Sequence, residues 1–145
     1  MVMDLCAGET LAAILEKRKK LPGVEAIKLA APVLRALDYA HRKGVVHRDL
    51  KPANLMVFRD EHWNEDVKIL DFGIAKLLDG TGASDDAGMA VNTGGMLVGT
   101  PQYMSPEQAQ GQPIDARSDL YAMGVILYYM VTGRHPFRGA NPAEI

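Results

Sequence analysis

The sequence has only one cysteine and no large excess of positive or negative charge, and each of these features excludes a class of protein. Cys6 is the only cysteine in 145 residues, so no disulfide can form within the chain. This is typical of a reducing, cytoplasmic compartment. The formal net charge is -2, which excludes a strongly basic nucleic-acid binder. We therefore expect a cytoplasmic chain with no nucleic acid among its partners.

The sequence also lacks any apolar run long enough to cross a bilayer. Its longest apolar stretch, residues 120–131, is too short and is interrupted by Gly124. The N-terminus has no basic region before its apolar residues, so it is not a signal peptide. We predict no membrane segment within this chain, although a longer parent protein could carry an anchor elsewhere.

Apolar residues at helical spacing predict three helices. Thr10 can cap a helix over residues 11–20, and a second helix extends from Pro22 to Gly44. Pro32 inside that second helix lacks an N–H, so a bend or a lost hydrogen bond is expected near it. Residues 115–131 are apolar on nearly all sides, which indicates a buried helix that ends at Thr132–Gly133. The predicted apolar face of the second helix contains Ile27, Ala30, Ala31, Leu34 and Leu37.

Short β-prone runs lie at residues 2–6, 45–46, 55–58 and 67–70. The charged segment 59–66 between the last two runs predicts a hairpin loop. Residues 78–95 are rich in Gly, Ser, Thr and Asp without an apolar period, which predicts a long mobile loop; loops of this length are usually functional or disordered.

The segment HRDLKPAN at residues 47–54 has the groups that phosphoryl transfer needs. The carboxylate of Asp49 can accept the proton of an attacking hydroxyl. The lysine two residues later, Lys51, can neutralise the charge of the transferred group. The amide oxygen of Asn54 can face a metal ion. Positioning and electrostatics carry most of the catalysis in such reactions.

Two further segments follow in a fixed order. The DFG sequence at residues 71–73 follows a predicted strand and precedes the long loop. Alone it would favour a simple turn, but in this place it predicts a metal-binding Asp71 and a packing Phe72. The segment GTPQYMSPE at residues 99–107 then closes the loop and begins a short helix.

Together these motifs resemble the eukaryotic-like serine/threonine protein kinases found in bacteria. The H-R-D and D-F-G motifs match letter for letter, the family's A-P-E is Ser105-Pro106-Glu107 here, and its D-x-W-x-x-G begins at Asp119 with Tyr121 in place of Trp. The resemblance implies a kinase-like α+β fold. Residues 1–145 would form a partial domain, a mainly helical C-terminal lobe with short β-hairpins and no N-terminal lobe. This partial domain would contain the hinge, the catalytic loop, the activation segment and the helix after S-P-E, and would be truncated at both ends.

The resemblance also implies roles for individual residues, with ATP and Mg²⁺ as cofactors and Mn²⁺ as an alternative metal. Asp49 resembles the catalytic base, and Lys51 resembles the lysine that contacts the γ-phosphate in Ser/Thr kinases. Asn54 and Asp71 resemble the metal ligands. Thr100 resembles the threonine that bonds the base and the lysine, and Asp119 the buried carboxylate that holds the catalytic loop. The residues that resemble the ATP-binding hinge and the covers of the adenine are Met3, Asp4, Cys6, Leu11 and Met56.

Several other polar residues favour a structural role over a catalytic or metal-binding one. His47 resembles the family's structural histidine that packs on Phe72, rather than a metal ligand. His41, His62 and His135 lack partners at metal-ligand spacing and are interpreted as surface or capping residues. Asp119 could also cap the helix that follows it.

No Gly-rich loop or V-A-I-K lysine precedes the hinge, and the large-lobe helices that pair an arginine with Glu107 are missing. Two functions therefore compete. The first is transfer of the ATP γ-phosphate to Ser/Thr hydroxyls of protein substrates, as part of a complete kinase domain. The second is an inactive fragment or a pseudokinase-like module that binds nucleotide or protein. We expect the 145 residues alone to be inactive.

Regulation is expected in the segment between Asp71 and Glu107. Arg48 directly precedes the base, and in kinases with that arginine a phosphate on the loop pairs with it. Thr93, seven residues before Thr100, is the predicted acceptor, with Thr81 and Ser84 next.

Overall fold

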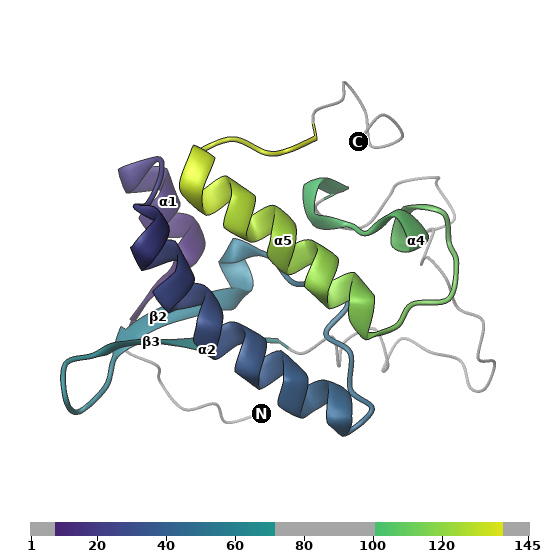
Figure 1. Cartoon of the computed structure of the whole chain (residues 1–145), viewed down its shortest axis with the longest axis horizontal. Coiled ribbons are helices and arrows are strands. Elements are labelled where there is room, and N and C mark those ends of the chain that lie inside the picture. Colours follow the sequence, from purple (N-terminus) through teal and green to yellow (C-terminus); the bar gives the residue numbers. More distant parts are fainter. Residues whose placement is uncertain (1–7, 72–100, 138–145) are drawn as a thin grey trace.

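The computed structural model describes residues 8–71 and 101–137, which form a small antiparallel sheet flanked by helices (Figure 1). The strands are β1 (Gly8–Thr10), β2 (Leu55–Arg59) and β3 (Glu65–Ile69), in the order β1-β2-β3. The helices are α1 (Leu11–Arg18), α2 (Gly23–Arg42), α4 (Pro106–Ala109) and α5 (Ala116–Thr132). Two 3₁₀ turns, Pro52–Asn54 and Pro101–Tyr103, complete the described elements.

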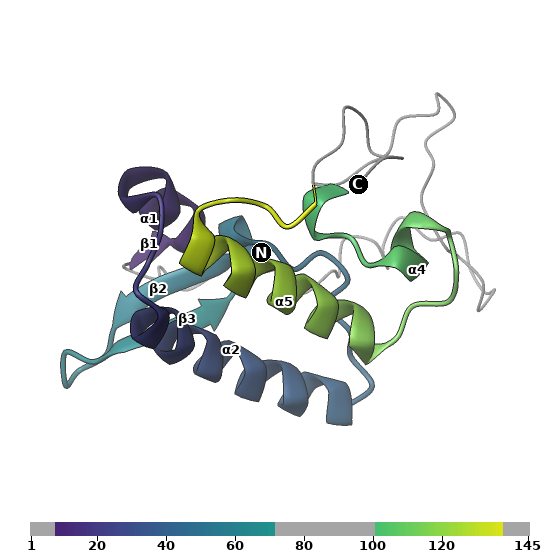
Figure 2. The ribbon, with the colours of Figure 1, turned by 45° about the horizontal axis from the view of Figure 1, so that its top comes forward.

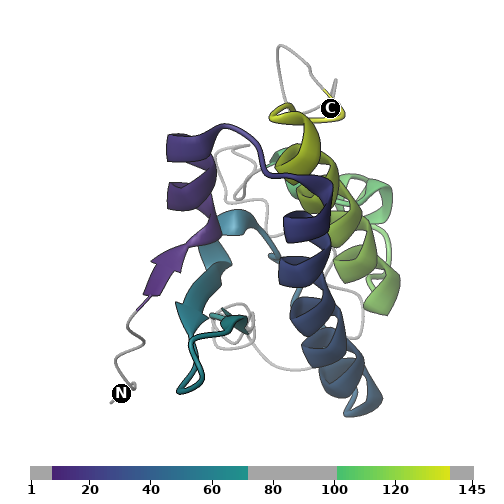
Figure 3. The ribbon, with the colours of Figure 1, turned by 60° about the vertical axis from the view of Figure 1, so that its left-hand side comes forward.

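Helices α2 and α5 lie side by side and run in opposite directions (Figures 1 and 2). Seen from the side, α2 and α5 lie on the same side of the sheet (Figure 3). The pair is joined near both ends. Leu21 N–H, just before α2, donates to the carbonyl of Met130 at 2.7 Å, and His41 near the end of α2 contacts Asp119 near the start of α5 at 2.7 Å.

The hydrophobic core fills the space between these helices and the inner face of the sheet. From the sheet it takes Leu55, Val57 and Val67, which alternate with more exposed residues as a half-buried strand requires. The helices contribute side chains that are almost completely buried, among them Leu15, Val33, Leu37, Ile126 and Met130.

Helix α1 forms as predicted. Thr10 has extended backbone angles, and its hydroxyl accepts from the N–H of Ala13 at 3.2 Å, which satisfies one donor of the first turn. Leu11 and Leu15 are buried and Ile14 packs beside them. The helix ends at Arg18, two residues earlier than predicted, because Lys19 takes a positive φ of 67°.

Helix α2 also forms, but its predicted apolar face is wrong at two positions. Ile27 and Leu34 are 64% and 41% exposed. Apolar residues occupy more than one side of this helix, and the stripe that meets the sheet and α5 contains Ala26, Leu29, Ala30, Val33, Leu37 and Ala40. The helix continues through Pro32. The hydrogen bond that a residue there would donate is absent because proline has no N–H.

The predicted hairpin is confirmed with a shorter loop. β2 extends to Arg59 and β3 begins at Glu65, and the carboxylate of Asp60 accepts backbone N–H groups of His62 and Asn64 in the turn. The segment predicted as a strand at residues 2–6 lies outside the described residues. β1 was not predicted. Gly8 permits it because a Cβ there would lie 2.4 Å from the carbonyl oxygen of Val57.

The predicted strand at Val45 and Val46 is wrong. Val45 N–H donates to Ala40 at the end of α2. The backbone N–H groups of His47 and Arg48, just after Val46, are bound by a side-chain carboxylate. These donors are therefore not available to a sheet.

Helix α5 begins after Asp115, whose carboxylate caps Arg117, and ends at Gly133. Ile126 and Met130 are fully buried, as predicted. The helix is not buried on all sides, since Leu120 and Tyr128 are about half exposed at 50% and 46%.

Candidate active site

The predicted catalytic loop, residues 47–54, is fixed by a carboxylate from α5. Asp119 is 1% exposed, and its two oxygens accept the backbone N–H groups of His47 and Arg48, each at 2.9 Å. Hydrogen bonds to an ionised group are stronger than neutral ones and are not competed by water when buried. The predicted role of Asp119 in holding this loop is confirmed, and the helix cap is Asp115 instead.

A third donor to the same carboxylate was missed from the sequence. His41 Nε2 lies 2.7 Å from Asp119 Oδ2, and the histidine side chain is only 14% exposed. The interpretation of His41 as a surface or capping residue is therefore wrong. The two residues are 78 positions apart, and no spacing rule connects them, so only the antiparallel packing of α2 on α5 reveals the contact.

His47 joins the loop to the end of the hairpin. Its Nδ1 accepts the N–H of Asp49 at 3.3 Å, so the ring proton lies on Nε2, which donates to the carbonyl of Leu70 at 3.1 Å. The side chain is completely buried. His47 is therefore a structural residue in these contacts, as expected. The predicted stack on Phe72 lies outside the described residues.

Asp49 and Lys51 face each other on the loop. Lys51 Nζ lies 2.9 Å from Asp49 Oδ2, and the two side chains are 25% and 35% exposed. Arg48 just before them has a positive φ of 68°, a conformation that costs a non-glycine residue about 1–2 kcal/mol. Such strain persists only where the surroundings hold it and is frequent at functional sites.

Asn54 and Asp71 are brought together by the hairpin. Asn54 Nδ2 donates to the carbonyl of Asp49 at 2.9 Å, which leaves Oδ1 as the atom that can meet a cation. The backbone carbonyl of Asn54 accepts the N–H of Leu70 at 2.8 Å, so the next residue, Asp71, lies beside the loop. Asp71 is exposed and has a positive φ of 51°.

The predicted adenine covers lie next to the Asn54 end of the loop, where β2 begins. Thr10 pairs with Met56 across β1 and β2, which places Leu11 near Met56. Leu11 is 2% exposed in the core, whereas Met56 is half-buried on the opposite face of β2 from Leu55 and Val57. The remaining predicted residues, Met3, Asp4, Cys6, Thr93 and Thr100, lie outside the described part of the chain.

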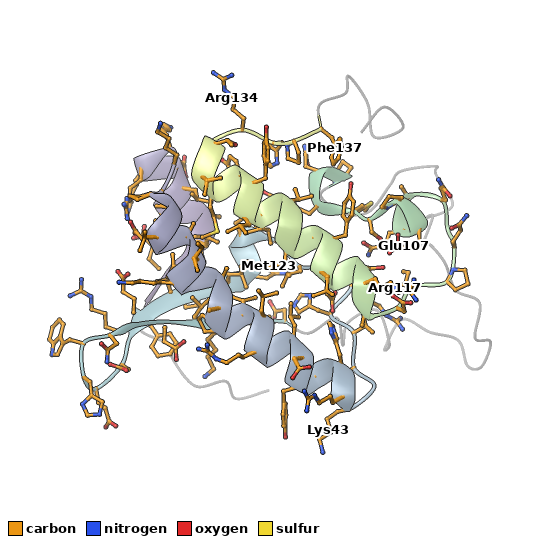
Figure 4. The ribbon with its side chains drawn as sticks, in the orientation of Figure 1. Lys43, Glu107, Arg117, Met123, Arg134 and Phe137 are labelled. Atoms are coloured by element: carbon orange, nitrogen blue, oxygen red, sulfur yellow. The ribbon has the colours of Figure 1, made fainter. Side chains whose placement is uncertain are left out.

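The S-P-E segment forms a capped helix that faces the catalytic loop. Ser105 and Gln108 make a capping box at the start of α4. Ser118 of α5 donates to Glu107, and this bond is the main cause of a lowered Glu107 pKa. Figure 4 shows Glu107 beside Arg117, a cation that lowers the pKa further. Glu107 was expected to lack its family partner, and in this structure Ser118 binds it.

Gln108 was also missed from the sequence. Its Nε2 donates to the carbonyl of Arg48 at 2.7 Å, and a small cavity lies between this contact, Asp49 and Tyr103. The spacing S-x-x-Q at residues 105–108 is a capping-box signature and could have revealed half of its role. A larger cavity between α1, α2 and the sheet shares no residue with the catalytic loop.

The other two histidines have different outcomes. His62 is exposed in the hairpin loop, as expected. His135 is half-buried, stacked on Tyr129 with ring centroids 4.5 Å apart and edge-on to Tyr103. The expectation of a surface or capping residue is wrong for His135, because the chain after α5 folds back over these two tyrosines.

Residues 8–71 and 101–137 include no helix with both the length and the apolarity to cross a bilayer. They also contain no group of three His, Cys, Asp or Glu side chains that could hold a metal.

The site thus consists of a buried carboxylate that holds a loop with a paired Asp and Lys, followed by an Asn and a second Asp. The sequence matches the protein kinase domain family over residues 1–145, and the chain belongs to this family. It is 48% identical over 137 residues to serine/threonine-protein kinase pkn3 of Myxococcus xanthus. It is 41% identical over 145 residues to serine/threonine-protein kinase PknB of Mycolicibacterium smegmatis.

A third relative is a probable serine/threonine-protein kinase of Streptomyces coelicolor, 43% identical over 145 residues. The matches cover 94% to 100% of this chain but only 20% to 24% of the three relatives. The chain thus spans about a fifth to a quarter of the length of the curated relatives it matches.

Proposed function

We propose that this chain transfers the γ-phosphate of ATP to Ser or Thr hydroxyls of protein substrates in the cytoplasm, as part of a complete kinase domain. The observation that carries the proposal is the 2.9 Å contact between Lys51 Nζ and Asp49 Oδ2. It lies on a loop whose backbone is held by the buried Asp119. Family membership supports the reaction class.

In the proposed reaction the substrate hydroxyl oxygen attacks the γ-phosphorus. The bond from that phosphorus to the β–γ bridging oxygen breaks, and ADP leaves with the electron pair. The hydroxyl proton passes to the carboxylate of Asp49. Lys51, held at hydrogen-bond distance from Asp49, neutralises charge on the transferred phosphoryl group. Loose phosphoryl-transfer transition states require this kind of positioning and charge compensation more than covalent chemistry.

Asn54 and Asp71 suit Mg²⁺. Both offer hard oxygen atoms, and Asn54 is oriented because its Nδ2 is bound to the Asp49 carbonyl. Mg²⁺ is generally held by one or two carboxylates together with substrate phosphates and water, so a small ligand set is sufficient. When bound, the metal neutralises the β- and γ-phosphates. Mn²⁺ prefers similar oxygen ligands.

We also propose that the described elements belong to the mainly helical C-terminal lobe, with ATP bound between it and a second lobe. Leu11 and Met56 would contribute to the adenine side, together with the hinge residues Met3, Asp4 and Cys6. The position of Met56 on the outer face of β2 supports this assignment.

Phosphorylation of Thr93 is proposed to regulate the reaction, and Thr100 is proposed to contact Asp49 and Lys51. Arg48 is exposed beside the base and can pair with a phosphate. Phosphopeptide mapping of the active full-length protein is expected to find Thr93 modified, and an unmodified Thr93 in that form would contradict the assignment.

The test uses the full-length product of the gene, radiolabelled ATP and a generic basic protein. Asp49→Asn is expected to lower kcat by roughly 10²–10⁴-fold, the usual contribution of a positioned base. Asp38→Asn is the matched control, because Asp38 is an exposed α2 carboxylate that pairs with Arg42, away from the catalytic loop. Nucleotide binding without transfer by the unmodified protein would favour the pseudokinase-like alternative.

A further inference from the structure

Gln108 uses both ends of its side-chain amide to connect two distant segments. Oε1 accepts the backbone N–H of Ser105 at 3.0 Å, which completes the cap of α4. Nε2 donates to the carbonyl of Arg48 at 2.7 Å, 60 residues earlier in the chain. The cap explains one end only. The proposed transfer reaction does not by itself require the bond to Arg48.

The bond reaches a peptide unit that decides where Asp49 lies. The carbonyl of Arg48 and the N–H of Asp49 belong to the same planar unit. Gln108 holds the oxygen edge of this plane, and His47 Nδ1 accepts from its nitrogen edge at 3.3 Å. The preceding plane is held by Asp119, which accepts the Arg48 N–H at 2.9 Å.

Hydrogen bonds from other segments are needed to fix this peptide plane, because Arg48 is in the left-handed region, with φ at 68°. An L-residue leaves that region for a less strained one unless its surroundings prevent it. Rotation of the peptide plane between Arg48 and Asp49 would move the Cα of Asp49. It would therefore also move the Asp49 carboxylate, which lies 2.9 Å from Lys51 Nζ.

We infer that Gln108 is a positioning residue for Asp49, which fixes the plane between Arg48 and Asp49 only when α4 is docked against the catalytic loop. The inference rests on the proposed function and adds a specific coupling to it. One side-chain amide thus links the S-P-E segment to the peptide unit that precedes the proposed base. Gln108 does not touch the reacting atoms.

Gln108→Glu separates the two ends of this side chain. Glutamate at the third helical position is the usual partner in a capping box, so the cap to Ser105 remains, and a negative charge suits a helix N-terminus. The donor to Arg48 is lost, and a carboxylate oxygen faces a carbonyl oxygen instead.

Ser105→Ala is the matched control. It removes the hydroxyl that accepts the Gln108 N–H, so it weakens α4, but it leaves the bond from Nε2 to Arg48 intact. Alanine is also the letter that the family's A-P-E motif has at this position. This variant is expected to lower the thermal midpoint with kcat unchanged.

The full-length protein is assayed with ATP and a basic protein substrate. Gln108→Glu is expected to lower kcat about tenfold, the factor that loss of one such hydrogen bond carries. The KM for ATP should stay within about twofold because no nucleotide contact changes, and the thermal midpoint should be unchanged. A kcat equal to the unmodified protein overturns the inference. So does a loss of kcat in both variants that follows their loss of stability, because Gln108 would then act only as a cap.

Amide hydrogen exchange separates this inference from the proposed function. If the unmodified protein transfers no phosphate, the proposed function fails, and exchange at Asp49 N–H still tests the link. If the Asp49 N–H exchanges faster in Gln108→Glu than in Ser105→Ala, the result supports the inference that Gln108 fixes the peptide plane between Arg48 and Asp49. Equal exchange in the two variants overturns it.

Discussion

Replacing Asp119 with asparagine tests the main support of the catalytic loop. The carboxylate accepts from His47 N–H at 2.9 Å, Arg48 N–H at 2.9 Å and His41 Nε2 at 2.7 Å. Asparagine is nearly the same size but offers one oxygen and one NH₂ group. Whichever way the amide turns, the NH₂ faces a backbone N–H, and one buried donor loses its acceptor.

The cost follows from the burial of these groups. Asp119 is 1% exposed and His47 is completely buried, so water cannot replace the lost acceptor. A buried unsatisfied donor costs about 1–3 kcal/mol, and hydrogen bonds to charged groups contribute about 1.5–3 kcal/mol. His41 can accept from the new NH₂ by changing its tautomer. We therefore expect Asp119→Asn to destabilise the protein by about 3 kcal/mol.

The assay is urea unfolding together with amide exchange at residues 47–50. Asp115→Asn is the control, because asparagine caps a helix as well as aspartate does, and Asp115 lies on the same helix but is exposed. It should change stability by less than about 0.5 kcal/mol. If Asp119→Asn unfolds at the same urea concentration as the control, and its loop amides exchange no faster, the reasoning about this carboxylate is refuted.

Four further substitutions have expected outcomes. Pro32→Ala should stabilise the protein by up to about 3 kcal/mol, because it restores a helical donor, and a thermal midpoint that falls would contradict this. Gly133→Ala should destabilise it, because its φ is +68° and a Cβ would lie 2.8 Å from a backbone oxygen. Gly124→Ala, where a Cβ meets nothing within 4 Å, should stabilise it by about 0.5–1 kcal/mol; calorimetry compares the two. Glu107→Gln should make the free energy of unfolding fall less steeply as the pH is lowered. The Glu107 pKa is lowered from 4.5, chiefly by the hydrogen bond from Ser118. The contribution of Glu107 to stability is therefore present above about pH 4.5 and is lost as the pH falls through the folded pKa. If the free energy of unfolding, measured with urea from about pH 3 to 7, depends on pH in the same way for both proteins, the reasoning is refuted.

The sequence was sufficient to predict features set by neighbouring residues. The cap at Thr10, the hairpin from Leu55 to Ile69 and the start and end of α5 depend on local chemistry, and all three are confirmed with small shifts. The placement of Asp49 near Lys51 was also accessible, because the two residues lie on the same loop.

The sequence was insufficient where distant segments compete for the same groups. Val45 and Val46 have β-prone side chains, but the backbone donors that follow them bind Asp119, which lies in α5. His41 is read as a surface residue until α2 packs on α5. Ile27 and Leu34 fit a helical period equally well, and only the position of the sheet and α5 decides which stripe is buried.

Asp119 is synthesised well after His47 and Arg48, the two residues whose N–H groups it binds. The contacts join residues 72 and 71 positions apart, and a chain emerges from the ribosome N-terminus first, at about 5–20 residues per second. For several seconds the nascent polypeptide carries residues 47–54 without the carboxylate that holds them. The geometry of Asp49 is therefore acquired late in biosynthesis, once α5 has emerged and packed against α2.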